Sequence, residues 1–555
     1  MSRVRSSSVC TLVCLALVAS AHAQAVLHPQ DSIHSPGDAF GDPVVLQGTR
    51  LAVGAPLASG AGSGSGELRL YDVGPPLAWQ ATLVGSDLSA GDHFGGSAAL
   101  DGDVLVVGAD RHAHGPGEAG AAYVFRWNGS AFVQEAELMA SDRAGGDNFG
   151  SGVAVSGERI VVGAPGCDTT AGADQGALYV FERVGGAWTE VFKGIASDGA
   201  SVALGWRVSL DGNRALAASP LSGGLNGAVY SFLRGSAGWA PETIFTPPAG
   251  TGTGEFGYGQ SVSADVVAIG MPFCTGSGAV FVYRLVAGSW TLEASLHLVD
   301  GNGLDQFGCG VELQGNRFVA GARGLSVWNY WTGAAFLFER IGGVWKERLQ
   351  LVPESGAQND YLGMTVALDW PRAAVGGAAP LDTAHVFALS DLVGSAFCLG
   401  DGGGSACPCA NESLPGLDGG CLNGFGRGAV LAATGSTSVA ADDLVLSFAH
   451  GVHGYGWPPY GTPILLLAGT AQVNGGLGAL LGDGLKCVEG GTQRLAVRLG
   501  TPFGAGLTVF PGGMIAHGGW SAGDVRHFQA WYRDPGGPCG TRFNTSNGLR
   551  IAFTP

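Results

Sequence analysis

The chain has 555 residues, of which 98 are glycine; 13% of its residues are charged and 46% are hydrophobic. This combination excludes an intrinsically disordered chain, and the lack of a Gly-X-Y period excludes collagen. A long α-helical protein is disfavoured because each glycine inside a helix costs about 0.5–1 kcal/mol relative to alanine. The composition favours an all-β chain with many tight turns.

The first 23 residues have the features of a secretory signal peptide. Arg3 and Arg5 precede an apolar run from Val9 to Val18, and Ala21-His22-Ala23 has the small-x-small pattern of a cleavage site. We therefore expect cleavage near Ala23 and a secreted, extracellular or cell-surface protein. No other stretch offers about 18 uninterrupted apolar residues, so no transmembrane segment is expected.

The charge of the chain bears on its partners. The net charge is −17, and loss of Arg3 and Arg5 with the signal makes it −19. Such an acidic protein disfavours nucleic acid and anionic membrane surfaces as partners. An extracellular protein or polysaccharide is the expected partner.

Two short phrases recur along the chain with a period of 51 to 55 residues. The first resembles Asp-x-Phe-Gly and ends at Gly41, Gly95, Gly150, Gly205, Gly257, Gly308 and Gly363. The second resembles Gly-Ala-Pro and begins 13 residues later in every copy, at Gly54, Gly108, Gly163, Ala218, Gly270, Gly321 and Gly376. The constant offset indicates that one structural unit is repeated seven times.

The second copy illustrates the strands of one unit. A strand at 97–100 and an apolar strand at 104–107 flank the turn Asp101-Gly102, which is a strong hairpin signal. A third strand covers 120–125, and a fourth begins at Phe132. In other copies the fourth strand begins with Trp79, Trp188, Trp239, Trp290 or Trp345. Four strands per unit at this period predict the blades of a seven-bladed β-propeller.

The seventh copy ends without a fourth strand of its own. The segment Ala25–His28 precedes the first phrase as a fourth strand should. We therefore expect Ala25–His28 to complete the seventh blade and close the ring.

The paired phrases resemble FG-GAP repeats, the units of the seven-bladed propeller that begins integrin α subunits. The resemblance covers residues 24–392 and implies a domain that binds ligands through the loops of one face. Calcium-binding blades of that family carry an acidic loop between the first two strands, where this chain has only a two-residue turn such as Asp101-Gly102. Because Ca²⁺ needs six to eight oxygen ligands, we expect neither Ca²⁺ nor any other cofactor.

A second domain is expected at residues 393–555, since the composition changes near Ser390 and the repeated phrases stop. Its end, from Phe528 to Pro555, resembles a C-terminal module of secreted planctomycete-type bacterial proteins. Apolar runs at 428–433, 444–448, 464–467 and 495–499 predict strands. A disulfide-containing antiparallel β-sandwich is the predicted architecture.

Cysteine spacing predicts disulfides rather than a zinc site. The second domain contains six cysteines and no C-x₂-C pair, at Cys398, Cys407, Cys409, Cys421, Cys487 and Cys539. We expect Cys487 to pair with Cys539, and the connectivity of the other four stays open. In the propeller, Cys274 and Cys309 are expected to bridge neighbouring blades, which leaves Cys167 as a buried or free thiol.

Catalytic signatures such as G-x-S-x-G, H-E-x-x-H and a Walker loop do not occur. Asp110, His112 and His114 offer metal-ligand chemistry, but we favour a solvated loop because the sequence reveals no further ligand. The aspartates of the first phrase are expected to cap the turn before the strand. As a ring they offer a cation site as the alternative: Asp38, Asp92, Asp147, Asp305 and Asp360.

One loop differs from its counterparts, because Trp328-Asn329-Tyr330-Trp331 stands where other copies have small residues. Clustered aromatic residues in a loop are a common anchor for protein or sugar partners. The alternative is that they cover a hydrophobic seam against the second domain. We expect a non-enzymatic binding or adhesion protein that uses this loop face. The alternative function is a secreted hydrolase whose site is assembled across the face from dispersed Asp, Glu and His.

Overall fold

The computed structural model describes the chain in segments. They are residues 18–21, 25–27, 31–34, 37–74, 77–113, 117–199, 202–274, 276–298, 303–326, 331–352, 358–377, 382–389, 392–413, 419–424, 426, 428–449, 463–499, 505–508 and 513–555. Over these segments the protein is all-β with short helical turns. No helix among them is both long and apolar enough to cross a membrane.

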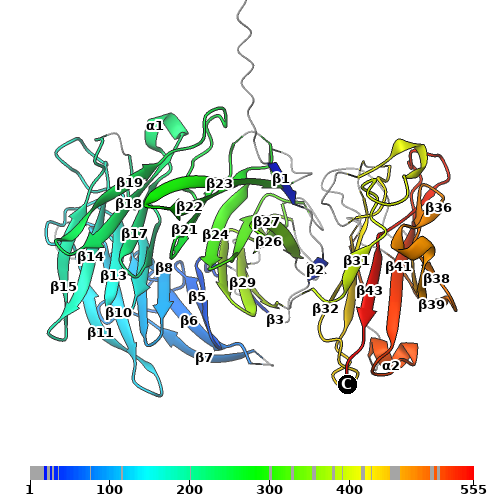
Figure 1. The fold of residues 1–555 in the computed structure, drawn as a ribbon. Helices are drawn as coiled ribbons and strands as arrows, with labels where there is room; N and C mark the ends of the chain where they lie inside the picture. The colour runs from blue at the N-terminus through cyan, green and yellow to red at the C-terminus, as the bar shows by residue number, and fades with distance from the viewer. Residues whose placement is uncertain are drawn as a thin grey trace, which may run out of the picture.

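The chain up to Ala388 folds into antiparallel sheets, most of which use four consecutive strands (Figure 1). The first are β4 (Val44–Gln47), β5 (Arg50–Ala55), β6 (Glu67–Asp72) and β7 (Ala78–Leu83); β8 (Phe94–Asp101), β9 (Val104–Ala109), β10 (Ala121–Trp127) and β11 (Phe132–Leu138); and β12 (Gly152–Ser156), β13 (Arg159–Ala164), β14 (Ala177–Val184) and β15 (Ala187–Gly194). Next come β16 (Val208–Asp211), β17 (Arg214–Ser219), β18 (Ala228–Gly235) and β19 (Gly238–Phe245); β20 (Gln260–Ser263), β21 (Val266–Met271), β22 (Ala279–Val286) and β23 (Ser289–Leu298); and β24 (Phe307–Gln314), β25 (Arg317–Ala322), β26 (Ala334–Ile341) and β27 (Val344–Leu351). The last of the series combines β28 (Thr365–Asp369), β29 (Arg372–Gly377) and β30 (Thr383–Ala388) with β3 (Asp31–His34).

The strands predicted from the phrases are confirmed. In the second copy the hairpin residues are 102–103, one position later than predicted, because Asp101 pairs with Val104. The register shifts between the third and fourth strands, at Val124/Phe125 in this sheet and at the matching place in others. Such a bulge increases the local twist, which suits an outer strand.

The strand that joins the last sheet of the series is not the predicted one. Ala25–Leu27 (β2) pairs in parallel with β27 of the preceding sheet, so the prediction for Ala25–His28 is wrong. β3 pairs with β30 instead. The Ser32 hydroxyl lies 2.8 Å from Nδ1 of His385, and Ile33 packs against the core between the last and first sheets. A further strand, β1 (Val18–Ala21), pairs with β23 and lies within the predicted signal peptide.

One kind of hydrogen bond joins neighbouring sheets at two places in the series. Ser97 of β8 donates a hydrogen bond of 2.6 Å to the main-chain oxygen of Gly150, which precedes the next sheet. Thr365 of β28 donates the equivalent bond to Gly41, before the first sheet, at 2.7 Å. The last sheet therefore contacts the first as the second contacts the third, although Thr365 and Gly41 lie 324 residues apart.

Glycine is required where the sheets approach most closely. Gly95, from the first phrase, has φ of +91°, and a Cβ there would lie 2.5 Å from the oxygen of Glu67. A Cβ on Gly108, from the second phrase, would lie 2.0 Å from the oxygen of Gly150. The residue two positions before each first-phrase glycine is left-handed too, with φ between 50° and 60° at Ala39, His93, Asn148, Ala203, Glu255, Gln306 and Tyr361. The repeated phrases therefore provide the positive φ angles and the lack of side chains that let neighbouring sheets pack closely.

The C-terminal part contains two main sheets. One comprises β31 (Ser395–Phe397), β43 (Gly548–Ala552), β41 (Val525–Arg533), β34 (Pro463–Gly469) and β39 (Gln493–Leu499), with β42 (Phe543–Thr545) on β41; the other comprises β32 (Val430–Thr434), β33 (Val445–Ala449) and β40 (Ala505–Thr508). Both sheets contribute to one core that contains Leu431, Leu446, Leu466, Phe528 and Ile551. The predicted strands are confirmed, and Val430 and Ala432 of β32 pack into the cluster that contains Leu389 at the end of β30.

The structure pairs the six C-terminal cysteines in three disulfides, Cys398–Cys487, Cys407–Cys421 and Cys409–Cys539. The predicted Cys487–Cys539 pair is wrong. Cys487 is fully buried in a small cluster with Leu485 and Val488 that also contains Cys398.

The predicted bridge between Cys274 and Cys309 is not formed. Both are buried thiols, as is Cys167. The Cys309 thiol is directed at the following sheet, where it donates to the Gly363 oxygen at 3.1 Å. Cys274 packs instead among the apolar residues beneath its own loop, including Phe256 and Ile269.

Candidate functional site

One end of the sheets carries both repeated phrases. We define the loop face as the connections that contain the first phrase and those that follow the second phrase, for example 84–93 and 110–120. Several large apolar side chains are exposed there: Leu57, Ile195, Trp206, Leu221, Leu225, Phe273 and Leu304. Most of them lie in the connections between β15 and β24. The exposed apolar surface is therefore concentrated on one part of the loop face.

The connection between β25 and β26 contains the predicted binding residues. Trp328, Asn329 and Tyr330 lie outside the described residues. Trp331 is described, and its ring lies 5.7 Å from that of Tyr361 in the next first phrase. Tyr361 also donates its main-chain N–H to the Trp331 oxygen at 3.1 Å. The end of this loop is therefore anchored to the following sheet.

The start of the same connection contacts the preceding sheet. The Arg323 guanidinium lies over the rings of Tyr258 and Phe273, at 5.3 and 5.8 Å, and donates to the Tyr258 hydroxyl at 3.1 Å. It also donates to Gln306 Oε1 at 2.5 Å. The two rings meet edge to face at 5.9 Å. These contacts fix the Arg323 guanidinium against the rings of Tyr258 and Phe273 at the start of the β25–β26 connection.

A pocket of about 640 Å³ adjoins this surface, between the sheet of β16–β19 and that of β20–β23. Its wall includes Asn226, Tyr230 and the segment 246–253, together with the short helix α1 (Ser222–Leu225). Phe273 is not among the lining residues, but its N–H donates to the oxygen of Gly254, the residue after the lining segment, at 3.3 Å. The volume falls within the range of small-ligand sites, and apart from Tyr230 the lining is mostly proline, glycine and small polar residues.

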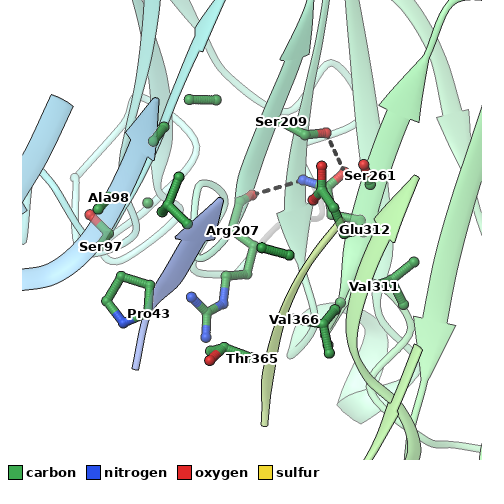
Figure 2. A pocket seen from close by; sticks show the side chains of 18 of the residues that line it. Pro43, Ser97, Ala98, Arg207, Ser209, Ser261, Val311, Glu312, Thr365 and Val366 are labelled. Carbon is green, nitrogen blue, oxygen red and sulfur yellow. Dashed lines mark hydrogen bonds between the residues drawn. The ribbon is translucent and has the colours of Figure 1, made fainter. Parts of the chain in front are cut away.

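A second cavity, of about 280 Å³, is lined by the first strand of every sheet in the series. Figure 2 shows the side chains of Arg207 and Glu312 in it. Arg207 lies 4.0 Å from Asp42, a carboxyl whose pKa burial raises while Arg207 lowers it in smaller measure. Burial raises the pKa of Glu312 to about 8. The cavity therefore holds one carboxyl, Glu312, whose pKa lies near 8, but it offers little room for a large ligand.

The three candidate metal ligands of the second copy are not arranged as predicted. His112 is 3% exposed, so the solvated-loop interpretation is wrong for this residue. Asp110 lies 3.7 Å from His93 rather than beside His112, and His114 lies outside the described residues. His112 instead faces Asp87, Asp92 and Glu137.

The capping interpretation is confirmed for two first-phrase aspartates. Asp92 accepts the N–H of Ser89 at 2.6 Å, and Asp147 accepts that of Ala144 at 2.7 Å. Asp38 instead forms an ion pair with Arg69 at 2.8 Å. The first-phrase carboxylates therefore have local partners that differ from sheet to sheet.

Sequence reasoning missed Tyr258, Phe273 and Arg323. Arg323 stands where most copies have proline, and Tyr258 directly follows a first-phrase glycine. Both departures from the repeat were visible in the sequence. Their convergence was not, because it depends on how two neighbouring sheets are placed.

The sequence was also compared with known proteins. The model of the FG-GAP repeat matches residues 78–125 and 132–181. Each matched segment begins with the outer strand of one sheet, β7 or β11, and continues through the first three strands of the next. The comparison with curated proteins gives no match. FG-GAP repeats and three disulfides are consistent with an extracellular protein.

Proposed function

We propose that this chain is an exported, non-enzymatic binding or adhesion protein that recognises an extracellular protein or polysaccharide through its loop face. Residues 24–392 would form a closed seven-bladed propeller of FG-GAP type. Residues 393–555 would form a β-sandwich, for which the resemblance to a secreted bacterial module offers a precedent. Cleavage near Ala23 would release the mature chain.

The closed ring is supported by the repeated contacts between sheets. The bond from Thr365 to Gly41 reproduces that from Ser97 to Gly150, and the first strands of all sheets line one cavity. A closed ring would cover the faces of the first and last sheets, which an open stack would expose, and would leave only short sheet edges.

The observation that carries the binding function is the arrangement around the β25–β26 connection. Arg323 is held over Tyr258 and Phe273 at its start, and Trp331 packs on Tyr361 at its end. Phe273 is nevertheless 38% exposed and Trp206, on the same face, 42%. Rigid aromatic groups beside a fixed arginine have the composition of binding hot spots.

A screen identifies the ligand. The mature protein is applied to a glycan array and to a panel of purified extracellular proteins, and each hit is titrated by calorimetry. Trp328→Ala combined with Trp331→Ala is expected to abolish binding with little change in the melting temperature. A large loss of stability together with unchanged affinity would show that the pair is packing rather than contacting a ligand.

The control is Trp79→Ala. Trp79 is 62% exposed on β7, away from the loop face. This variant should bind as the native protein does. Turnover of a glycoside or ester substrate by the native protein would contradict the proposal and favour a hydrolase.

A further inference from the structure

The sheet β8–β11 holds a cluster of one histidine and three carboxylates at its loop-face end. His112 follows β9, Asp87 and Asp92 lie in the connection before β8, and Glu137 lies on β11. The His112 side chain is 3% exposed and that of Asp87 is 39% exposed. The cluster is thus buried on its histidine side and open to solvent on the Asp87 side.

The imidazole is held in one orientation. Asp92 Oδ2 lies 2.8 Å from Nδ1 of His112, which directs Nε2 toward Asp87 Oδ2 and Glu137 Oε1, each at 3.7 Å. The Tyr123 hydroxyl donates to the other oxygen of Asp87 at 2.8 Å. A carboxylate on the far nitrogen of the ring is the usual partner of a metal-binding histidine.

The next sheet has the same arrangement of side chains, except that a lysine stands in place of one of the carboxylates. Asp142, Cys167, Tyr179 and Lys193 occupy the positions of Asp87, His112, Tyr123 and Glu137. Lys193 Nζ donates to Asp142 Oδ2 at 2.6 Å and to Cys167 Sγ at 3.3 Å. In that sheet the ammonium group of Lys193 lies between Asp142 and Cys167.

The sheet β8–β11 has a carboxylate where its neighbour has this ammonium group. Glu137 corresponds to Lys193 of the next sheet, so the position next to Asp87 is anionic where its counterpart next to Asp142 is cationic. The donor atoms of Asp87, His112 and Glu137 lie within 4.8 Å of one another. Two ligands bound at about 2.1 Å in a tetrahedral site are roughly 3.4 Å apart, close to the 3.7 Å separations from Nε2.

We propose that Asp87, His112 and Glu137 bind a divalent transition-metal ion such as Zn²⁺, with Asp92 and Tyr123 as positioning residues. One nitrogen and two oxygens suit Zn²⁺ or Mn²⁺ and are too few for Ca²⁺. Three protein ligands leave a fourth position for water on the exposed Asp87 side. The ion would link the connection before β8 to strand β11. The site is separate from the surface around Arg323, Tyr258 and Phe273.

The test is zinc binding by the mature protein after chelator treatment, measured by calorimetry and by metal analysis after dialysis. The native protein is expected to bind about one Zn²⁺ per chain and to melt at a higher temperature with zinc than without it. Glu137→Lys, which supplies the ammonium group of the neighbouring sheet, and the nearly isosteric Glu137→Gln should both lose this binding.

Two further variants separate the site from other zinc ligands. Asp92→Asn should weaken binding by about 10–100-fold, as expected for a positioning residue. Lys193→Gln, the matched change in the next sheet, should leave the affinity unchanged. The proposal is overturned if the native protein binds no zinc, or if both Glu137 variants bind it as tightly as the native protein does.

Discussion

Trp345 belongs to the outer strand of one sheet but donates its indole N–H to Glu293 in the preceding sheet, at 2.9 Å. Arg340, on the strand beside Trp345, contacts the same carboxylate at 2.6 Å. Glu182, on the third strand of the sheet two positions earlier, has the same role, because it accepts bonds from Arg234 and Trp239 of the following sheet. Trp345 and Trp239, each near the start of a fourth strand, thus help to join neighbouring sheets.

Trp345→Phe should destabilise the protein by about 2 kcal/mol, because a buried hydrogen bond to a charged group is lost. Glu293 keeps its bonds to Arg284 and Arg340, so the fold should survive. Urea denaturation measures the change. Trp79→Phe, on an exposed tryptophan, should shift stability by less than about 0.5 kcal/mol, and equal shifts for the two variants would refute the role of the bond.

Glu182→Gln should reveal a pH-dependent contribution. The hydrogen bond from Arg234 is the largest cause that holds the pKa of Glu182 below its ordinary value, with Trp239 and Arg159 adding to it. Its stabilising effect is therefore complete above the unfolded-state pKa, near 4.3, and is lost as the pH falls through the folded-state pKa. The stability difference between native protein and variant should be largest near pH 6 and shrink toward pH 3. A difference that stays constant over this range would contradict the assignment.

Glu312→Gln should behave in the opposite way. Burial raises the pKa of Glu312 to about 8, so folding favours its protonated form. Stability then declines as the pH rises from about 4.3 through 8, because the carboxyl must ionise inside the cavity. The variant should be more stable than the native protein at pH 9 and similar at pH 4, in denaturant titrations at both values. Part of the decline should persist, since burial also raises the pKa of Glu347 to about 8. Equal stability at pH 9 would be inconsistent with an ionising carboxyl here.

The loss of stability on removing a disulfide should increase with the length of the loop that it closes. Cys409–Cys539 closes a separation of 130 residues and Cys407–Cys421 one of 14. Chain entropy assigns them about 5 and about 3 kcal/mol. Serine substitution of both cysteines in each pair, followed by thermal melting of the C-terminal transition, is expected to give the larger loss for Cys409–Cys539. The reverse order would show that packing around each bridge outweighs loop entropy.

Much of the fold follows from the repeated phrases, because their constant spacing reflects a constant backbone. Glycines such as Gly95 and Gly108 stand where a Cβ would collide with a neighbouring sheet, the preceding one for Gly95 and the following one for Gly108. The strand that pairs with β30 was misassigned, because the apolar segment Ala25–Leu27 has the stronger strand pattern, whereas Asp31–His34 is mostly polar and is placed by contacts such as that of Ser32 with His385.

The sites were less predictable, because they bring together residues that lie far apart in the sequence. His112 is buried among carboxylates that lie 20 to 25 residues away in sequence, at Asp87, Asp92 and Glu137. Disulfide pairing failed for the same reason. Cys398 and Cys487 meet across 89 residues, and cysteine spacing alone does not encode that approach.

Hydrogen exchange with and without the bound partner tests the central claim most directly. If the loop face binds the ligand, amides at 222–226, 247–254, 323–326 and 358–363 should gain protection. The hairpins at the opposite end, such as 102–103 and 315–316, should exchange as before. Protection confined to those hairpins or to residues 393–555, with the loop face unchanged, would contradict the proposed function.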